Sequence, residues 1–143
     1  MEQEVECVFC DLIKTGNARW VAREGAAVAF LPLPGGALAP GHTLVAPRAH
    51  FVGVLDVDSQ ALHATLKLVQ RVSRAMCSKL GATGVVLLNA SGPHSGQSVD
   101  HLHFHVVPCW PDDGATFWPE DRSQHLVNGA PLELLTSALT QGE

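Results

Sequence analysis

Three histidines alternate with apolar residues in one segment of the chain, the run His101-Leu102-His103-Phe104-His105-Val106. Because side chains alternate between the two faces of a β-strand, residues 99–107 are predicted to form a strand with the histidines on one face and the apolar residues on the other. Neutral imidazoles act as nucleophiles, proton carriers and metal ligands near pH 7. The spacing therefore predicts a strand whose histidine face can bind or react with a ligand and whose apolar face packs on the core.

The segment just before these histidines is rich in hydrogen-bond donors. Gly96 allows backbone N–H groups to approach a ligand closely, and Gln97 and Ser98 add side-chain donors suited to phosphate oxygens or a leaving-group atom. A donor-lined loop that leads into a neutral histidine favours attack of the imidazole on phosphorus, with the donors stabilising charge on the phosphate oxygens. Two alternatives stay open here: an exposed strand with incidental histidines, and a metal site formed by two or three of them.

A second group of candidate ligands lies in the N-terminal third of the chain. Cys7 and Cys10 have the Cys-x-x-Cys spacing common in zinc sites, and a tetrahedral structural site needs two further ligands. His42 and His50 flank a short apolar segment, residues 43–46. His42 has an alternative interpretation as a hydrogen-bonded histidine in a turn, whereas His50 is a candidate partner for the two cysteines.

Composition excludes several classes of protein. The chain has 143 residues, of which 46% are hydrophobic and 16% charged, so intrinsic disorder is excluded and a single domain over residues 1–143 is expected. The formal net charge of −5 argues against a nucleic-acid binder, which would carry a basic footprint. Four cysteines are too few for a disulfide scaffold.

Neither a membrane span nor a targeting segment is expected. Residues 25–47 carry no Asp, Glu, Lys or Arg, but prolines and glycines interrupt them, and such residues break helices. The N-terminal residues 1–6 are acidic and have no apolar core of the kind that signal peptides contain. A cytoplasmic protein with reduced cysteines is therefore expected.

Short strands and one long helix are predicted to position the candidate residues. Strands are expected at 19–23 and 26–31 as a hairpin, and further strands at 43–46 and 84–89. Asp58 is an expected N-cap and Gly81 an expected stop for a helix with apolar residues at helical spacing. Short helices are expected near both ends, at 7–15 and 132–139. The predicted fold class is α+β, with a mainly antiparallel sheet, one long helix and short terminal helices.

Three blocks carry a resemblance to a known family, and they are Cys7-Val8-Phe9-Cys10, residues 41–50 and residues 96–105. Together and in this order, they resemble the histidine-triad (HIT) superfamily of nucleotide hydrolases and transferases, in its zinc-containing bacterial form. The resemblance implies a homodimer with an α+β fold, a core at about 7–110 and a variable segment at 111–143. It also implies a purine nucleotide or nucleotidyl conjugate as the bound partner.

The resemblance implies a role for each matching residue. His103 matches the nucleophile, which attacks the α-phosphorus of a nucleotidyl compound and forms a nucleotidyl-histidine that water or another acceptor then cleaves. His105 matches the residue beside the phosphate, and His42 matches the histidine behind it. Phosphate and leaving-group contacts fall on Gln97 and Ser98. The implied substrate pocket comprises Val8, Phe9, Leu12, Phe30, Asn89 and Gly96, of which the first four have an alternative interpretation as core residues, and Asn89 as a turn cap.

The resemblance also implies a structural zinc ion. Family members that bind zinc use two N-terminal cysteines, a histidine after a Pro-basic-x step and the first histidine of the triad. The matching residues are Cys7, Cys10, His50 and His101. Such a closed site has no open position for catalysis, so His101 would hold the metal while His103 carries out the chemistry.

One departure from the family concerns the sugar of the substrate. Members usually carry an acidic residue or Asn two positions after the matching Phe, where it contacts ribose hydroxyls, but Pro32 follows Phe30 at that spacing. Either Asn17 or a backbone carbonyl replaces this acceptor, or the substrate is not an ordinary ribonucleotide. Two functions follow from the resemblance: a phosphoramidase or nucleotidyl hydrolase that uses His103, and alternatively a protein that binds a nucleotide-like ligand with little or no turnover.

Overall fold

Five strands form one antiparallel sheet in the computed structural model, which describes residues 7–142. The strands are β1 (Trp20–Arg23), β2 (Ala27–Phe30), β3 (Thr43–Pro47), β4 (Gly84–Leu88) and β5 (Phe104–Cys109). Their order across the sheet is β1-β2-β3-β5-β4, so β1 and β4 are the edges. The predicted α+β class with an antiparallel sheet is confirmed, whereas the acidic N-terminal residues 1–6 lie outside the described range.

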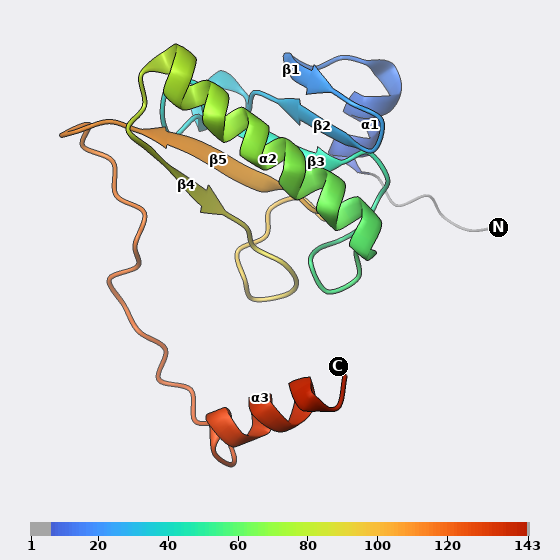
Figure 1. The fold of residues 1–143 in the computed structure, drawn as a ribbon, viewed down its shortest axis with the longest axis vertical. Helices are drawn as coiled ribbons and strands as arrows, with labels where there is room; N and C mark the ends of the chain where they lie inside the picture. The colour runs from blue at the N-terminus through green and yellow to red at the C-terminus, as the bar shows by residue number, and fades with distance from the viewer. Residues whose placement is uncertain (1–6, 143) are drawn as a thin grey trace.

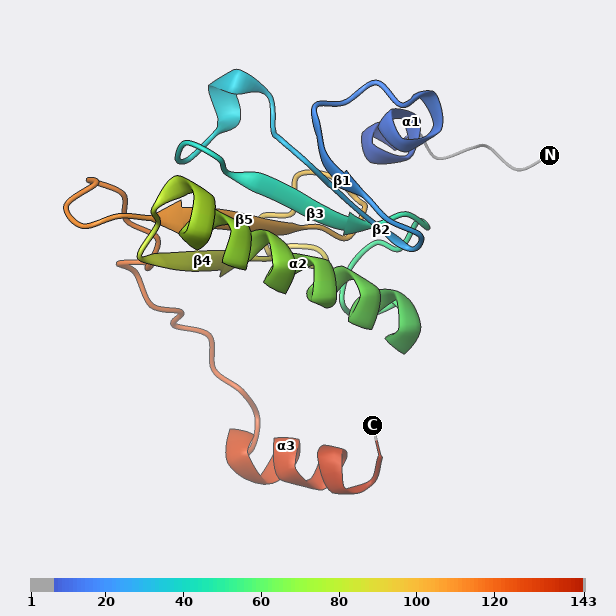
Figure 2. The same cartoon turned by 45° about the horizontal axis from the view of Figure 1, so that its top comes forward.

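The long helix α2 (Ser59–Leu80) covers one face of the sheet (Figures 1 and 2). The Asp58 side chain accepts a hydrogen bond from the Ala61 N–H at 2.7 Å, and Gly81 ends the helix in the left-handed region with φ +71°, as the sequence predicts. The buried side of the helix packs on alternate residues of the strands, and its members are Thr65, Leu68, Val69, Val72 and Met76.

The opposite face of the sheet packs against the short helix α1 (Val8–Thr15), as Figure 2 shows. Phe9 of α1 contacts the ring of Phe30 edge-on, with 5.2 Å between ring centroids. Both residues belong to a second buried cluster with Val28 and Leu44. This face carries the histidines, so α1 and the strands beneath it position the candidate site.

The strand predicted over residues 99–107 is shorter and begins later than expected. β5 starts only at Phe104, and of the three alternating histidines His105 alone lies within it. Both neighbouring ladders stop at this level: the last residue of β4, Leu88, pairs with His105, and the last pair between β3 and β5 is Val45 with Phe104. The carbonyl of His103 accepts its hydrogen bond from the Asn89 side chain instead, at 2.9 Å.

The C-terminal part of the chain leaves the sheet. Residues 110–130 contain no helix or strand, and they lead to α3 (Pro131–Thr140), which lies away from the sheet (Figures 1 and 2). This confirms the predicted short terminal helix. Every residue of α3 except Ala138 is exposed. No helix in the described part of the chain has the length and apolar character needed to span a membrane.

Candidate active site and metal centre

A cavity of about 590 Å³ opens on the face of the sheet that carries α1. Three histidines and a serine supply polar groups to its wall, and these are His42, His103, His105 and Ser98. Apolar residues supply most of the remainder, including the four predicted pocket residues Val8, Phe9, Leu12 and Phe30. The cavity therefore has the size and the apolar lining of a small-molecule site, with a few polar groups to orient a ligand.

The hydrogen bonds of His103 determine which ring nitrogen carries its proton. The Nδ1–H donates to the backbone carbonyl of His101 at 2.7 Å, because a carbonyl oxygen can only accept. Burial lowers the pKa of His103 below its ordinary value, so the ring is neutral at pH 7. A neutral ring with its proton on Nδ1 has a free electron pair on Nε2, and His103 can therefore act as a nucleophile.

His42 and His105 form a chain of hydrogen bonds that puts the proton of His105 on Nε2, whereas the proton of His103 is on Nδ1. The Leu38 N–H donates to Nδ1 of His42 at 3.0 Å, so a neutral His42 carries its proton on Nε2. That Nε2 lies 3.0 Å from Nδ1 of His105 and donates to it, which leaves the proton of His105 on its own Nε2. Burial, followed by the imidazoles of His103 and His42, lowers the pKa of His105 to about 4.

The rings of His103 and His105 thus differ in what they offer to a ligand. Their centroids are 5.1 Å apart, and both rings line the cavity. His103 presents a lone pair and His105 an N–H, a combination suited to attack on a phosphorus atom whose oxygen accepts a hydrogen bond.

Three residues predicted to touch substrate lie outside this cavity. The Oε1 of Gln97 accepts from the Gly92 N–H, and its Nε2 donates to two backbone carbonyls, so the amide is used within the protein. Gln97 and Gly96 line a smaller neighbouring hollow. Asn89 donates to the His103 carbonyl and accepts from the hydroxyl of Ser91. In this arrangement, Gln97 and Asn89 support the loop and the backbone of His103.

The four predicted metal ligands lie together beside α1. Ligand atoms of Cys7, Cys10, His50 and His101 all lie within 4.8 Å of one another. The Nε2–H of His101 donates to the Pro47 carbonyl at 2.8 Å, which leaves Nδ1 free, and this Nδ1 is 3.4 Å from Cys7 Sγ and 3.5 Å from Cys10 Sγ. Nδ1 of His50 is 3.3 Å from Cys10 Sγ.

These separations fit a tetrahedral ion. Zinc bonds to sulfur and nitrogen of ordinary length place the two ligand atoms about 3.5 Å apart. Burial, followed by the neighbouring Cys7, raises the pKa of the Cys10 thiol to about 11. Two thiolates are therefore unfavourable here without a cation between them. Among the described residues no other group of three or more ligand side chains converges.

Arg19 is a residue of the cavity that sequence reasoning missed. It lines the cavity beside Asn17, which was considered as a sugar contact, and beside Leu31 and Pro32. An arginine at the first position of a predicted strand, residues 19–23, indicates only an exposed position. The hydrogen bond that brings its guanidinium to the Pro32 carbonyl depends on the pairing of β1 with β2, which only the fold supplies.

The sequence and the structure were compared with known proteins. Residues 17–111 match the family model described as the HIT domain. An uncharacterized HIT-like protein of Saccharolobus solfataricus is 34% identical over 109 residues, covering 75% of this chain and 76% of that protein. An adenosine 5′-monophosphoramidase of Schizosaccharomyces pombe is 30% identical over 106 residues, covering 73% and 74%. The structure of a zinc-bound histidine-triad family protein from Mycobacterium smegmatis aligns with TM-score 0.72 and 29% identity, covering 94% of each chain.

Proposed function

This chain belongs to the HIT domain family, and from that membership we propose that it cleaves nucleoside phosphoramidates, or related nucleotidyl conjugates, at the α-phosphorus. One observation carries the proposal: the rings of His103 and His105 line the same cavity with centroids 5.1 Å apart, and their hydrogen bonds leave a lone pair on His103 Nε2 and a proton on His105 Nε2. The relative from Schizosaccharomyces pombe, which is named as an adenosine 5′-monophosphoramidase, supports the choice of substrate class.

The reaction proceeds in two displacements at phosphorus. His103 Nε2 attacks, the bond from phosphorus to the leaving nitrogen breaks, and that nitrogen keeps the electron pair and takes a proton from water. The His103 ring then carries a positive charge, which its Nδ1–H shares with the His101 carbonyl at 2.7 Å. Water next attacks phosphorus and gives a proton to the hydroxide that the first displacement left, the electron pair of the P–N bond returns to Nε2, and the nucleoside monophosphate leaves.

The N–H of His105 stabilises both displacements by donating to a phosphate oxygen. His42 keeps that proton on the correct nitrogen, since its own Nε2–H occupies Nδ1 of His105. Ser98 adds a hydroxyl to the wall of the same cavity. The apolar wall, which includes Phe9 and Phe30, receives the base.

The Cys7, Cys10, His50 and His101 cluster is proposed to hold zinc. Zinc would supply stability and no reacting atom, because four protein ligands leave no open position. The cluster positions His101, whose carbonyl holds the nucleophile. Thiolate ligands require reduced cysteines, so we also propose a cytoplasmic location.

Two copies of the chain are proposed to form a dimer. β4 is an edge strand, and its Leu87 is 47% exposed. The leucines of α3 at positions 132, 135 and 139 recur on one helix face and are exposed, although an isolated helix of this length is marginal in water. Analytical ultracentrifugation tests this proposal: the wild type should sediment as a dimer, and serine at the three leucine positions should weaken it. A monomeric wild type would contradict the proposal.

The catalytic proposal is tested by trapping the intermediate. Wild-type protein mixed with adenosine 5′-phosphoramidate and quenched should show one adenylyl group on His103 by mass spectrometry. His103→Asn should lose both the adduct and turnover, while His94→Asn, which replaces an exposed histidine of the neighbouring loop, should keep both. Unchanged turnover in His103→Asn would refute the mechanism. Binding of AMP without turnover by the wild type would favour the alternative function, a nucleotide-binding protein.

A further inference from the structure

The charged side chains that line the cavity differ from those of an ordinary sugar-binding pocket. Among the described residues that line it, Arg19 is the one formally charged side chain, and no Asp or Glu is present. A ribose hydroxyl needs an acceptor for its proton, and in sugar-binding sites a carboxylate often supplies one. Apart from Ser98 and the three histidines, the polar side chains of this wall are the Asn17 amide and the Arg19 guanidinium, and of these two only the amide can accept.

Hydrogen bonds hold Arg19 at the end of β2. Its backbone carbonyl accepts from the Leu31 N–H at 3.0 Å, and its guanidinium donates to the Pro32 carbonyl. A guanidinium has five N–H groups and no acceptor. The remaining N–H groups are available to a ligand, and they suit the acceptor-only oxygens of an anion better than a hydroxyl.

The sheet places this cation and the reactive histidines at different ends of the cavity. Paired residues run from Trp20 to Phe30, then to Leu44 and to His105, one on each of four strands. Three strand spacings separate the backbones of Trp20 and His105 by roughly 14 Å. Arg19 precedes Trp20, and its guanidinium turns back toward the carbonyl at position 32. A ligand that spans the cavity is therefore expected to place one anionic group at the neutral histidines and a second one at the guanidinium of Arg19.

We propose that the site selects nucleotides whose ribose carries a second phosphate, on the 2′ or the 3′ oxygen, with Arg19 as the residue that binds it. This inference rests on the proposed function, which places the 5′-phosphorus at His103. The apolar wall of Phe9 and Phe30 takes the base, so the sugar oxygens face the polar remainder of the wall. In dinucleotide-binding sites, a carboxylate contacts a free ribose hydroxyl, whereas an arginine contacts a phosphate on the ribose, because a guanidinium only donates hydrogen bonds.

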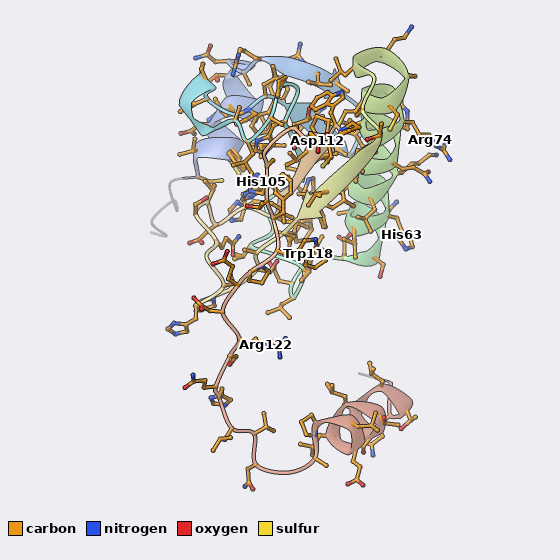
Figure 3. The ribbon with its side chains drawn as sticks, turned by 90° about the vertical axis from the view of Figure 1, so that its left-hand side faces the viewer. His63, Arg74, His105, Asp112, Trp118 and Arg122 are labelled. Atoms are coloured by element: carbon orange, nitrogen blue, oxygen red, sulfur yellow. The ribbon has the colours of Figure 1, made fainter. Side chains whose placement is uncertain are left out.

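Binding measurements with three unreactive nucleotides test the proposal. Isothermal titration calorimetry should show adenosine 2′,5′-bisphosphate or adenosine 3′,5′-bisphosphate binding about tenfold or more tightly than AMP, since a charge-assisted hydrogen bond is gained. The preferred isomer identifies the oxygen. Arg19→Gln should bring the ratio of bisphosphate affinity to AMP affinity down to about one, and Arg19→Lys should keep part of the preference. The matched control is Arg74→Gln, since Arg74 projects from α2 away from the sheet (Figure 3) and should keep the full preference.

Two outcomes of the titrations would overturn the proposal: equal affinity of the wild type for all three nucleotides, or a preference that persists in Arg19→Gln. Thermal melting shows whether Arg19→Gln remains folded, as an exposed position predicts.

Turnover separates this inference from the proposed function. The wild type should cleave a ribose-phosphorylated adenosine 5′-phosphoramidate with a kcat/KM about tenfold or more above that of the unphosphorylated compound. Equal kcat/KM values would overturn the role of Arg19 and leave the chemistry of His103 intact. A bisphosphate preference in binding, with no turnover and no adduct on His103, would refute the proposed function while supporting the role of Arg19.

Discussion

Protonation of His105 is expected to destabilise the fold as the pH falls. Burial first, and then the imidazoles of His103 and His42, lower the pKa of His105 from 6.5 to about 4. Between these values the unfolded chain binds a proton at this position that the folded chain does not bind. The contribution of His105 is therefore complete above pH 6.5, and it is lost as the pH falls from there toward the folded-state pKa.

The magnitude follows from the two pKa values. At about pH 5 the unfolded state is stabilised by protonation of this one group, relative to the folded state, by about 2 kcal/mol. Burial is the largest cause of the lowered pKa, and a second structural feature acts in the same direction, since Nδ1 of His105 accepts the hydrogen bond from His42 Nε2 at 3.0 Å. If Nδ1 of His105 were protonated, its N–H would face the Nε2–H of His42, and the hydrogen bond between them would be lost.

Urea unfolding at about pH 7.5 and about pH 5 measures this effect. Between the two conditions the wild type should lose about 2 kcal/mol more stability than His105→Asn, which lacks the titrating ring. Groups that do not contact His105, including those of the Cys7 cluster, contribute equally in both proteins, so the difference removes them. His63→Asn, which removes an exposed ring of α2 (Figure 3), is the matched control and should behave as the wild type. Equal losses in the wild type and His105→Asn would refute the reasoning.

Three further predictions concern the metal cluster, the hydrophobic core and the N-cap of α2. Cys7→Ser should reduce bound zinc from about one ion per chain to none and lower the melting temperature, as measured by atomic absorption and calorimetry, whereas Cys77→Ser, at an exposed thiol, should change neither. Leu68→Ala empties a position that is 2% exposed and should cost about 3 kcal/mol in urea unfolding. Asp58→Ala removes the acceptor of the Ala61 N–H and should cost about 1 kcal/mol, and a loss below the error of the measurement would contradict the capping role.

Local sequence patterns were sufficient to predict most of the fold. The N-cap at Asp58 and the stop at Gly81 predicted α2, because capping depends on residues within one turn of the helix end. The short apolar segments likewise predicted the strands. The late start of β5 at Phe104 could not be predicted, since it depends on where the neighbouring strands end.

For the candidate site too, the sequence predicted one part and the tertiary structure decided the other. Its chemical residue types, the spacing of the three histidines and the resemblance to the family could all be read from the sequence, because they are properties of the residues and of their order. The resemblance to the family also implied the four residues that the fold brings together as a possible metal cluster.

Tertiary structure alone decided which nitrogen of each ring carries a proton and which polar side chains reach the cavity. The carbonyl that orients His103 and the Leu38 N–H that begins the chain through His42 are backbone groups, and no residue type encodes their positions. The Gln97 amide hydrogen-bonds to backbone groups, and the pairing of β1 with β2 brings Arg19 to the cavity wall. Hydrogen bonds are directional and join groups far apart in the sequence, so their geometry exists only once the chain has folded.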